Sequence, residues 1–294
     1  FAVQVTNPVF FDLRPEKNWA IFKYLKKHNK KIFLDALATD HYYVKACLDG
    51  KTFRYSDFFV GDRPLPHPER EKMLAAWIGG PNERPNIEMA QEANGIIACL
   101  YEYYAAYQPE YADKLAYIPI PIDLSINPFH PIKSTPEVVK FFIGIQQHRT
   151  AIKGTDILLD VLREIHDKYP RESHIQKVVS VPFDEYNKLL VDCHILLDQL
   201  YSYTPATNAL AAMARGIIAV SGAEPEFYNF ISEQKLRPII NVLPDRNDIF
   251  KQLENLIIHR DQLPRLSTES RQFVEKYHDH VKVARQYLEF WEKH

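Results

Sequence analysis

Short apolar runs alternate along the chain with longer segments whose apolar residues recur at helical spacing. Most of the short runs are apolar throughout, which is typical of strands covered on both faces of a parallel sheet. The longer segments 154–169 and 247–263 each carry one apolar face. This alternation predicts an α/β fold with right-handed crossovers. The strands that we expect are 31–38, 94–100, 114–122, 138–145, 176–181, 194–200, 216–222 and 237–243.

The segment IPIPIDLSINPFHPIKSTPE (118–137) interrupts this rhythm, because its prolines resist continuing a helix or a central strand. We therefore expect two domains, 1–132 and 133–275, as a length of 294 residues also favours. One long final helix is expected over about 267–294, and its part from 276 onward is expected to pack back onto the first domain. Because the chain opens with Phe1, we expect its true beginning to be processed or to lie before these residues.

The composition is that of an ordinary soluble protein, with 46% hydrophobic and 25% charged residues. A net charge of −2 gives no electrostatic reason to expect nucleic acid as the main partner. Three widely spaced cysteines without a CxxC motif argue against a disulfide framework or a zinc site and favour a cytoplasmic protein. No metal is expected. The basic face at Lys23, Lys26, Lys27, Lys30 and Lys31 is more simply a solvated helix face than a peripheral contact with an anionic membrane.

The stretch DQLYSYTPATNALAAMARG (198–216) predicts a strand end, a turn and a helix. Thr204 suits the N-cap, Pro205 the first helical position, and Gly216 a helix end with positive φ. The free N–H groups at such a helix start attract an anion, but a well-capped core helix has the same pattern and is favoured when this stretch is taken alone. The N–H groups in question belong to Ala206, Thr207 and Asn208.

A second helix start follows the strand at 138–145, in GIQQHRTAIKGTDILLDVL (144–162). Arg149 and Lys153 precede this helix, where the helix dipole disfavours cations. A bound diphosphate would neutralise them, although surface solubility explains them equally well. Further along, Glu224 and Glu226 either bind sugar hydroxyls or open the next helix, and the second interpretation is favoured. The sequence contains no P-loop, GxGxxG, HExxH or GxSxG motif.

From about Asn94 onward the chain resembles group 1 glycosyltransferases of family 4, which have the GT-B fold. The resemblance is carried by RTAIKGT, VPFDEYNKLL, DQL with ALAAMARG, SGAEPE and the interdomain-like IPIPIDLSINPF. It implies two Rossmann-like domains whose parallel sheets face each other across a cleft. It also implies retaining transfer of a sugar from a nucleotide diphosphate sugar, without a metal or other cofactor. Arg149 and Lys153 then match the basic residues that contact the donor diphosphate, and the helix start at Ala206, Thr207 and Asn208 meets the phosphate.

Several positions depart from the family pattern. The family has a glutamate pair, and its second member reaches the donor ribose; these positions are Tyr203 and Ala211 here. In the first domain KIFLDALATD resembles a family strand end, with Asp40 at the aspartate and Leu37 at the histidine. The resemblance thus leaves Asp40 as the catalytic candidate. The candidates for the donor sugar or ribose are Tyr203, Glu224 and Glu226.

Two functions remain open on these grounds. The first is a cytoplasmic retaining glycosyltransferase, which moves a sugar from a nucleotide diphosphate sugar to a glycan or glycolipid acceptor in surface polysaccharide or glycolipid assembly. The second is a GT-B-shaped nucleotide-sugar-binding or partner protein that has lost catalysis, as Ala211 and Leu37 indicate. Both predict binding of a nucleotide sugar, but only the first predicts transfer.

Overall fold

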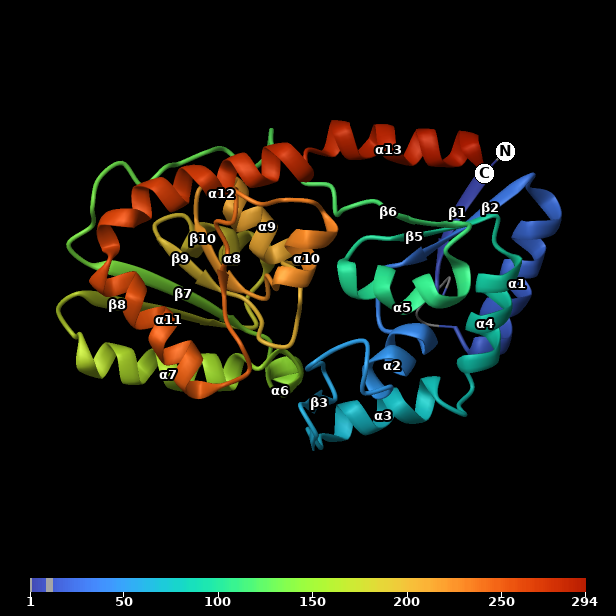
Figure 1. Ribbon diagram of the computed structural model, residues 1–294, viewed down its shortest axis with the longest axis horizontal. Helices are drawn as coiled ribbons and strands as arrows, with labels where there is room; N and C mark the ends of the chain where they lie inside the picture. The colour runs from blue at the N-terminus through green and yellow to red at the C-terminus, as the bar shows by residue number, and fades with distance from the viewer. Residues whose placement is uncertain (1, 9–12) are drawn as a thin grey trace. The chain divides into compact units, whose positions relative to one another are not determined.

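The computed structural model describes residues 2–8 and 13–294. By their internal contacts, the described residues divide into two compact units (Figure 1). One unit runs to Ile120 and includes Val281–His294, and the other is Pro121–His280. Each unit contains a parallel sheet with helices around it, so the α/β prediction is confirmed.

The first unit has a parallel sheet in the order β1-β2-β5-β6. Its edge strand β1 was not among the expected strands. A short antiparallel pair, β3 and β4, lies in the irregular tract. The elements are β1 (Ala2–Thr6), α1 (Pro15–His28), β2 (Lys31–Ala36), α2 (His41–Leu48), β3 (Phe59–Val60), β4 (Arg63–Pro64), α3 (Pro68–Trp77), α4 (Glu83–Glu92), β5 (Gly95–Ala98), α5 (Tyr101–Tyr111) and β6 (Leu115–Tyr117), and most of α13 (His280–Lys293) joins them.

Successive side chains of β2 alternate between the two faces of this sheet, as the pleat of a strand requires. Ile32 and Leu34 pack in one cluster with Phe22 of α1. Phe33, between them, packs in a different cluster with Phe290 of α13. The sheet is therefore buried on both faces, which explains why its strands read as continuous apolar runs.

The second unit has a parallel sheet in the order β11-β10-β9-β7-β8. Figure 1 shows α7 and α11 along one side of it, and α9 and α12 on the other. The elements are β7 (Val139–Ile145), α6 (Thr150–Lys153), α7 (Thr155–Lys168), β8 (Ser173–Val179), α8 (Phe183–Leu190), β9 (Ile195–Leu197), α9 (Thr207–Ala214), β10 (Ile218–Ser221), α10 (Pro225–Phe230), β11 (Ile240–Asn241), α11 (Arg246–Ile258) and α12 (Leu263–Tyr277), with 3-10 turns at Gln147–Arg149 and Arg260–Gln262.

The connecting segment 121–132 belongs to this second unit and not to the first. Asn127 explains the placement, because its side-chain oxygen accepts a hydrogen bond from Nε of Arg215 at 2.9 Å. Its backbone oxygen accepts another from Arg271 of α12 at 3.0 Å. The division between the units thus falls after Ile120, whereas the sequence placed it after residue 132.

The expected single helix over 267–294 is wrong, because α12 ends at Tyr277 and α13 begins at His280. The backbone N–H of Ile122 donates to the carbonyl of His278 at 2.7 Å, and the carbonyl of Ile122 accepts from the N–H of His280 at 3.2 Å. These two bonds form a parallel bridge in place of helical bonds, so the helix breaks there. No helix in the described ranges is long and apolar enough to cross a membrane.

Candidate functional site

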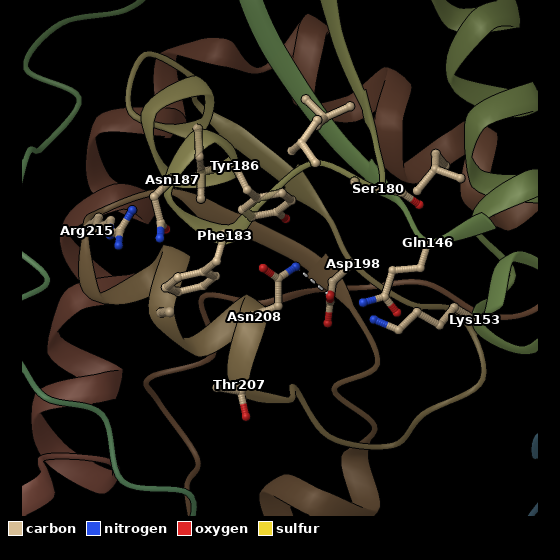
Figure 2. Close-up of a pocket in the computed structure, with 16 residues that line it drawn as sticks. Gln146, Lys153, Ser180, Phe183, Tyr186, Asn187, Asp198, Thr207, Asn208 and Arg215 are labelled. Atoms are coloured by element: carbon tan, nitrogen blue, oxygen red, sulfur yellow. Dashed lines mark hydrogen bonds between the residues drawn. The ribbon is translucent and has the colours of Figure 1, made fainter. Parts of the chain in front are cut away.

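A pocket of about 400 Å³ lies at the carboxyl ends of β7 and β9 in the second unit. Ligands of open α/β sheets bind outside the carboxyl ends of the strands, so its position is that of a binding site. Figure 2 shows the side chains that line it. The residues that carry its chemistry are Gln146, Lys153, Phe183, Tyr186, Asp198, Thr207, Asn208 and Arg215.

Lys153 is held at one end of this pocket by the local backbone. It is the last residue of α6, and its carbonyl accepts a hydrogen bond from the N–H of Leu200 at 2.9 Å, just beyond β9. Gly154 follows with φ of +67°, and a Cβ there would lie 2.7 Å from the Cβ of Leu200. Only glycine fits both the left-handed backbone and this close approach. The α6–α7 junction therefore fixes the backbone from which the Lys153 side chain lines the pocket.

Arg149, the other predicted cation, lies elsewhere. It ends the 3-10 turn before α6, is exposed, and is not among the described residues that line the pocket. The expected start of the second helix is confirmed, since α7 begins at Thr155 with Gly154 as its N-cap. The sequence did not reveal the short α6, which follows Arg149 and ends at Lys153.

The start of α9 differs from the prediction by two residues. Its N-cap is Ala206, whose backbone is extended and which has no side-chain capping bond, so neither Thr204 nor Pro205 has its predicted role. The preceding segment is not helical, and the carbonyl of Tyr203 within it accepts from the N–H of Glu224 at 3.0 Å. The helix then begins at Thr207, and the end with positive φ at Gly216 is confirmed.

The α9 N-terminus nevertheless meets the pocket. Thr207 and Asn208 line it, whereas Ala206 does not. The first N–H groups of a helix have no partner within the helix and carry a partial positive charge. Together with Lys153 they form the end of the pocket that favours an anion.

Asp198 stands between these elements and was not predicted as a site residue. It is only 3% exposed. Its Oδ1 accepts a hydrogen bond from Nδ2 of Asn208 at 2.8 Å, while its Oδ2 is buried with no hydrogen-bond partner among the described residues. Burial raises the pKa of the Asp198 carboxyl, against the opposing influence of Lys153 and Asn208. A polar residue that ends the apolar run HILL was the one available sign in the sequence.

Aromatic side chains line the rest of the pocket. The ring of Tyr186 packs edge-on against Phe142, with centroids 4.9 Å apart. A Cβ at Gly144 would lie 2.6 Å from this ring, so the glycine makes room for it. Phe183 lines the pocket although its side chain is 75% exposed. An exposed aromatic side chain of this kind offers a flat face for a planar ligand group.

The other donor candidates of the second unit do not line the pocket. Glu224 is the buried N-cap of α10, and its Oε1 accepts from Nδ2 of Asn241 at 2.9 Å. Glu226 lies in the first turn of the same helix, and Tyr203 is buried. Both glutamates thus occupy helix-opening positions, as the simpler interpretation expected.

Asp40, the catalytic candidate, is the N-cap of α2 in the first unit. Its Oδ1 accepts from the N–H of Tyr43 at 2.9 Å, and its Oδ2 accepts from the hydroxyl of Tyr107 at 2.6 Å. The side chain is 3% exposed, and burial raises its pKa to about 6 while the Tyr107 bond works to lower it. These contacts use both carboxylate oxygens of Asp40 at the start of α2, and its catalytic role stays a prediction. By contrast, Leu37, at the family's histidine position, is 42% exposed.

The site therefore joins a cationic end, a buried carboxylate and an aromatic end in one pocket. It suits an elongated ligand with an anionic group at one extremity and a planar group at the other. Within the described ranges, no group of three or more His, Cys, Asp or Glu residues is arranged to hold a metal ion.

Comparisons with known proteins give structural matches only. No protein-family model matches the sequence, and no curated protein matches it. Sucrose-phosphate synthase from Thermosynechococcus elongatus matches with a TM-score of 0.62 at 12% identity, over 99% of this chain and 73% of that one. Anabaena Alr3699/HepE in complex with UDP-glucose matches with 0.57 at 13%, over 94% and 82%. WaaG, a glycosyltransferase involved in lipopolysaccharide biosynthesis, matches with 0.52 at 14%, over 88% and 78%. The chain therefore has a GT-B fold like that of group 1 glycosyltransferases.

Proposed function

We propose that this protein is a retaining glycosyltransferase, which moves a sugar from a nucleotide diphosphate sugar to a glycan or glycolipid acceptor. The observation that carries the proposal is the convergence of Lys153 and the α9 N-terminus on one pocket at the strand ends. The fold supports it, since HepE, a structural neighbour, is described with UDP-glucose and WaaG is a glycosyltransferase. The unpaired cysteines favour a cytoplasmic location.

Each end of the pocket has a part in this reaction. The Lys153 ammonium neutralises charge on the departing diphosphate, and the first N–H groups of α9 orient it. Fixed charges of this kind are worth several kcal/mol in a site shielded from water. Arg149, on the exposed turn before α6, adds a second cation that attracts the anionic donor. The face of Phe183 receives the base.

A second function is favoured by one observation. Ala211 lines the pocket where the family carries the glutamate that reaches the donor ribose. A protein that binds nucleotide sugars on this fold without transferring the sugar would show the same substitution. Binding measurements alone do not separate the two functions.

Thermal unfolding with a panel of UDP-, GDP- and ADP-sugars tests the binding site. A ligand present at a hundred times its Kd stabilises the folded state by about 2.7 kcal/mol, which is a measurable rise in Tm. Lys153→Ala is expected to abolish this rise while the free protein stays folded. Lys133→Ala is the matched control, because Lys133 is exposed in the same unit and does not line the pocket.

Consumption of the sugar donor then distinguishes the two functions. Hydrolysis of the donor, or transfer to a glycan or glycolipid, supports the glycosyltransferase. A donor that binds but is not consumed supports the binding protein. If no nucleotide sugar raises the Tm, or if Lys153→Ala behaves like its control, the diphosphate site is refuted.

A further inference from the structure

The functions proposed so far give no role to Oδ2 of Asp198, the oxygen without a partner among the described residues. Resting on the proposed function, we infer that this oxygen accepts a hydrogen bond from a ribose hydroxyl of the bound nucleotide. Asp198 would then supply, from the end of β9, the carboxylate that α9 lacks at Ala211. It becomes a specificity-determining residue for the ribose.

The first argument is the cost of leaving this oxygen without a partner. A buried carboxylate that lacks hydrogen bonds is expensive, so such groups are normally fully paired. Asn208 holds Oδ1 in place at 2.8 Å, but Oδ2 has no partner among the residues described. It belongs to a residue that lines the pocket.

The second argument is the charge of the ligand. A carboxylate beside a diphosphate site repels the phosphates, and Lys153 is close enough to Asp198 to influence its titration. A carboxylate can only accept hydrogen bonds. Beside the phosphates it is therefore favourable when the ligand brings a hydrogen-bond donor to it. A hydroxyl close to the phosphates is such a donor.

The third argument is the order of groups along the pocket. Figure 2 shows Phe183 and Tyr186 on one side, with Arg215 beyond them, Lys153 and Gln146 on the other side, and Asp198 with Asn208 between. A nucleotide has the same order, with an aromatic base, a ribose carrying hydroxyls and then the phosphates. The ribose is therefore the part that meets the carboxylate.

The surroundings of Ala211 agree with this placement. Asn208 and Ala211 are three positions apart on α9, so they share one face of the helix, and both line the pocket. The alanine methyl leaves room that a longer side chain would occupy. The room lies on the same helix face as the amide that holds Asp198.

Asp198→Asn is the direct test, because it conserves shape and reverses the hydrogen-bonding character. Its amide oxygen can still accept from Asn208, while its NH₂ group then faces the pocket as a donor. We would measure the affinities of wild type and variant for UDP, ADP and GDP, for their 2′-deoxy and 3′-deoxy counterparts, and for pyrophosphate. Asp192→Asn is the control, an exposed carboxylate in the same unit.

Wild type should bind a ribonucleotide about ten- to a hundred-fold more tightly than at least one deoxy counterpart, as expected for one charge-assisted hydrogen bond. Asp198→Asn should weaken this preference, because its NH₂ group can offer a ribose hydroxyl only a neutral hydrogen bond, yet bind pyrophosphate at least as tightly as wild type because a repelling charge is gone. Asp192→Asn should keep the preference. Loss of pyrophosphate binding together with nucleotide binding in Asp198→Asn would indicate a merely structural role and overturn the inference.

Two further outcomes would also overturn it. One is a wild-type protein that binds ribo- and deoxynucleotides equally, a comparison that needs no variant. The other is an Asp198→Asn protein with the wild-type preference. In either case the response of Lys153→Ala to the sugar nucleotides still stands, so the proposed function survives. If wild type binds no nucleotide at all, both ideas fail.

Discussion

Replacing Asp40 by asparagine tests how much its buried carboxylate lowers the free energy of unfolding at neutral pH. Asparagine is as good an N-cap as aspartate, and its side-chain oxygen can still accept from the N–H of Tyr43. Its NH₂ group can donate to the hydroxyl oxygen of Tyr107, which reverses that bond without breaking it. The variant thus removes the charge and keeps the geometry of the cap.

The expected size of the effect follows from the pKa. Burial raises the pKa of Asp40 from 3.8 to about 6 in the folded protein. A difference of about 2 units corresponds to about 3 kcal/mol. Since the folded state holds the proton more tightly than the unfolded state, the free energy of unfolding falls as pH rises from about 4 to 6, and stays low at pH 7. Asp40→Asn should therefore stabilise the protein at pH 7 by about 1–3 kcal/mol, with no gain below pH 4.

Urea unfolding of wild type and variant between pH 4 and 8 measures this difference directly. Asp35, whose pKa burial also raises to about 6, keeps its own share of the pH dependence in both proteins. Asp49→Asn is a control of opposite sign. Slight burial works to raise the pKa of Asp49, but hydrogen bonds from Thr52 and Lys51 leave it lowered. That variant should be the less stable one at pH 7.

Two results would refute the inference that the buried, ionised Asp40 carboxylate destabilises the fold. One is a loss of stability in Asp40→Asn at pH 7, and the other is an unchanged pH dependence of the free energy of unfolding between pH 4 and 6. The same variant decides the role that the family resemblance gives to Asp40. A stable variant with wild-type transfer activity is expected if the residue only caps α2. A stable variant without transfer activity would support a catalytic role for Asp40.

Three other substitutions have definite expected outcomes. Gly154→Ala should lower the Tm more than Gly79→Ala: both have φ of +67° and lose about 1–2 kcal/mol for the left-handed backbone, but only the first meets neighbouring atoms within 4 Å. Glu233→Gln should cost about 1–3 kcal/mol at pH 7 in urea unfolding, because bonds from the Leu236 N–H and from Lys276 lower its pKa; the loss should begin to shrink below about pH 4.5 and continue to shrink toward the much lower pKa of the folded state. Phe183→Ala should leave the Tm nearly unchanged and weaken UDP binding about tenfold in calorimetry, since the side chain is 75% exposed.

The parallel sheets were predictable because their strands are buried on both faces. An apolar run such as VVKFFIGI needs no tertiary information to be assigned, and β7 (Val139–Ile145) lies within it. The irregular features were not predictable, because their causes are distant in sequence. The break at His278 depends on hydrogen bonds with Ile122. The start of α9 follows a non-helical segment in which Tyr203 bonds to Glu224, a contact that no local capping preference shows.

The same reason explains which site residues the sequence revealed. Lys153 and Asn208 stand next to recognisable helix starts, so their types and positions were enough to nominate them. Asp198 ends an apolar strand, where a single acidic residue has no local meaning. We single it out because its Oδ2 has no partner among the described residues, because the Asn208 amide holds its Oδ1, and because the Lys153 ammonium influences its pKa. If Asp198 binds the ribose as we infer, a carboxylate on a strand would do in this pocket what the family's glutamate does on a helix, and Ala211 alone would then be weak evidence for a lost function.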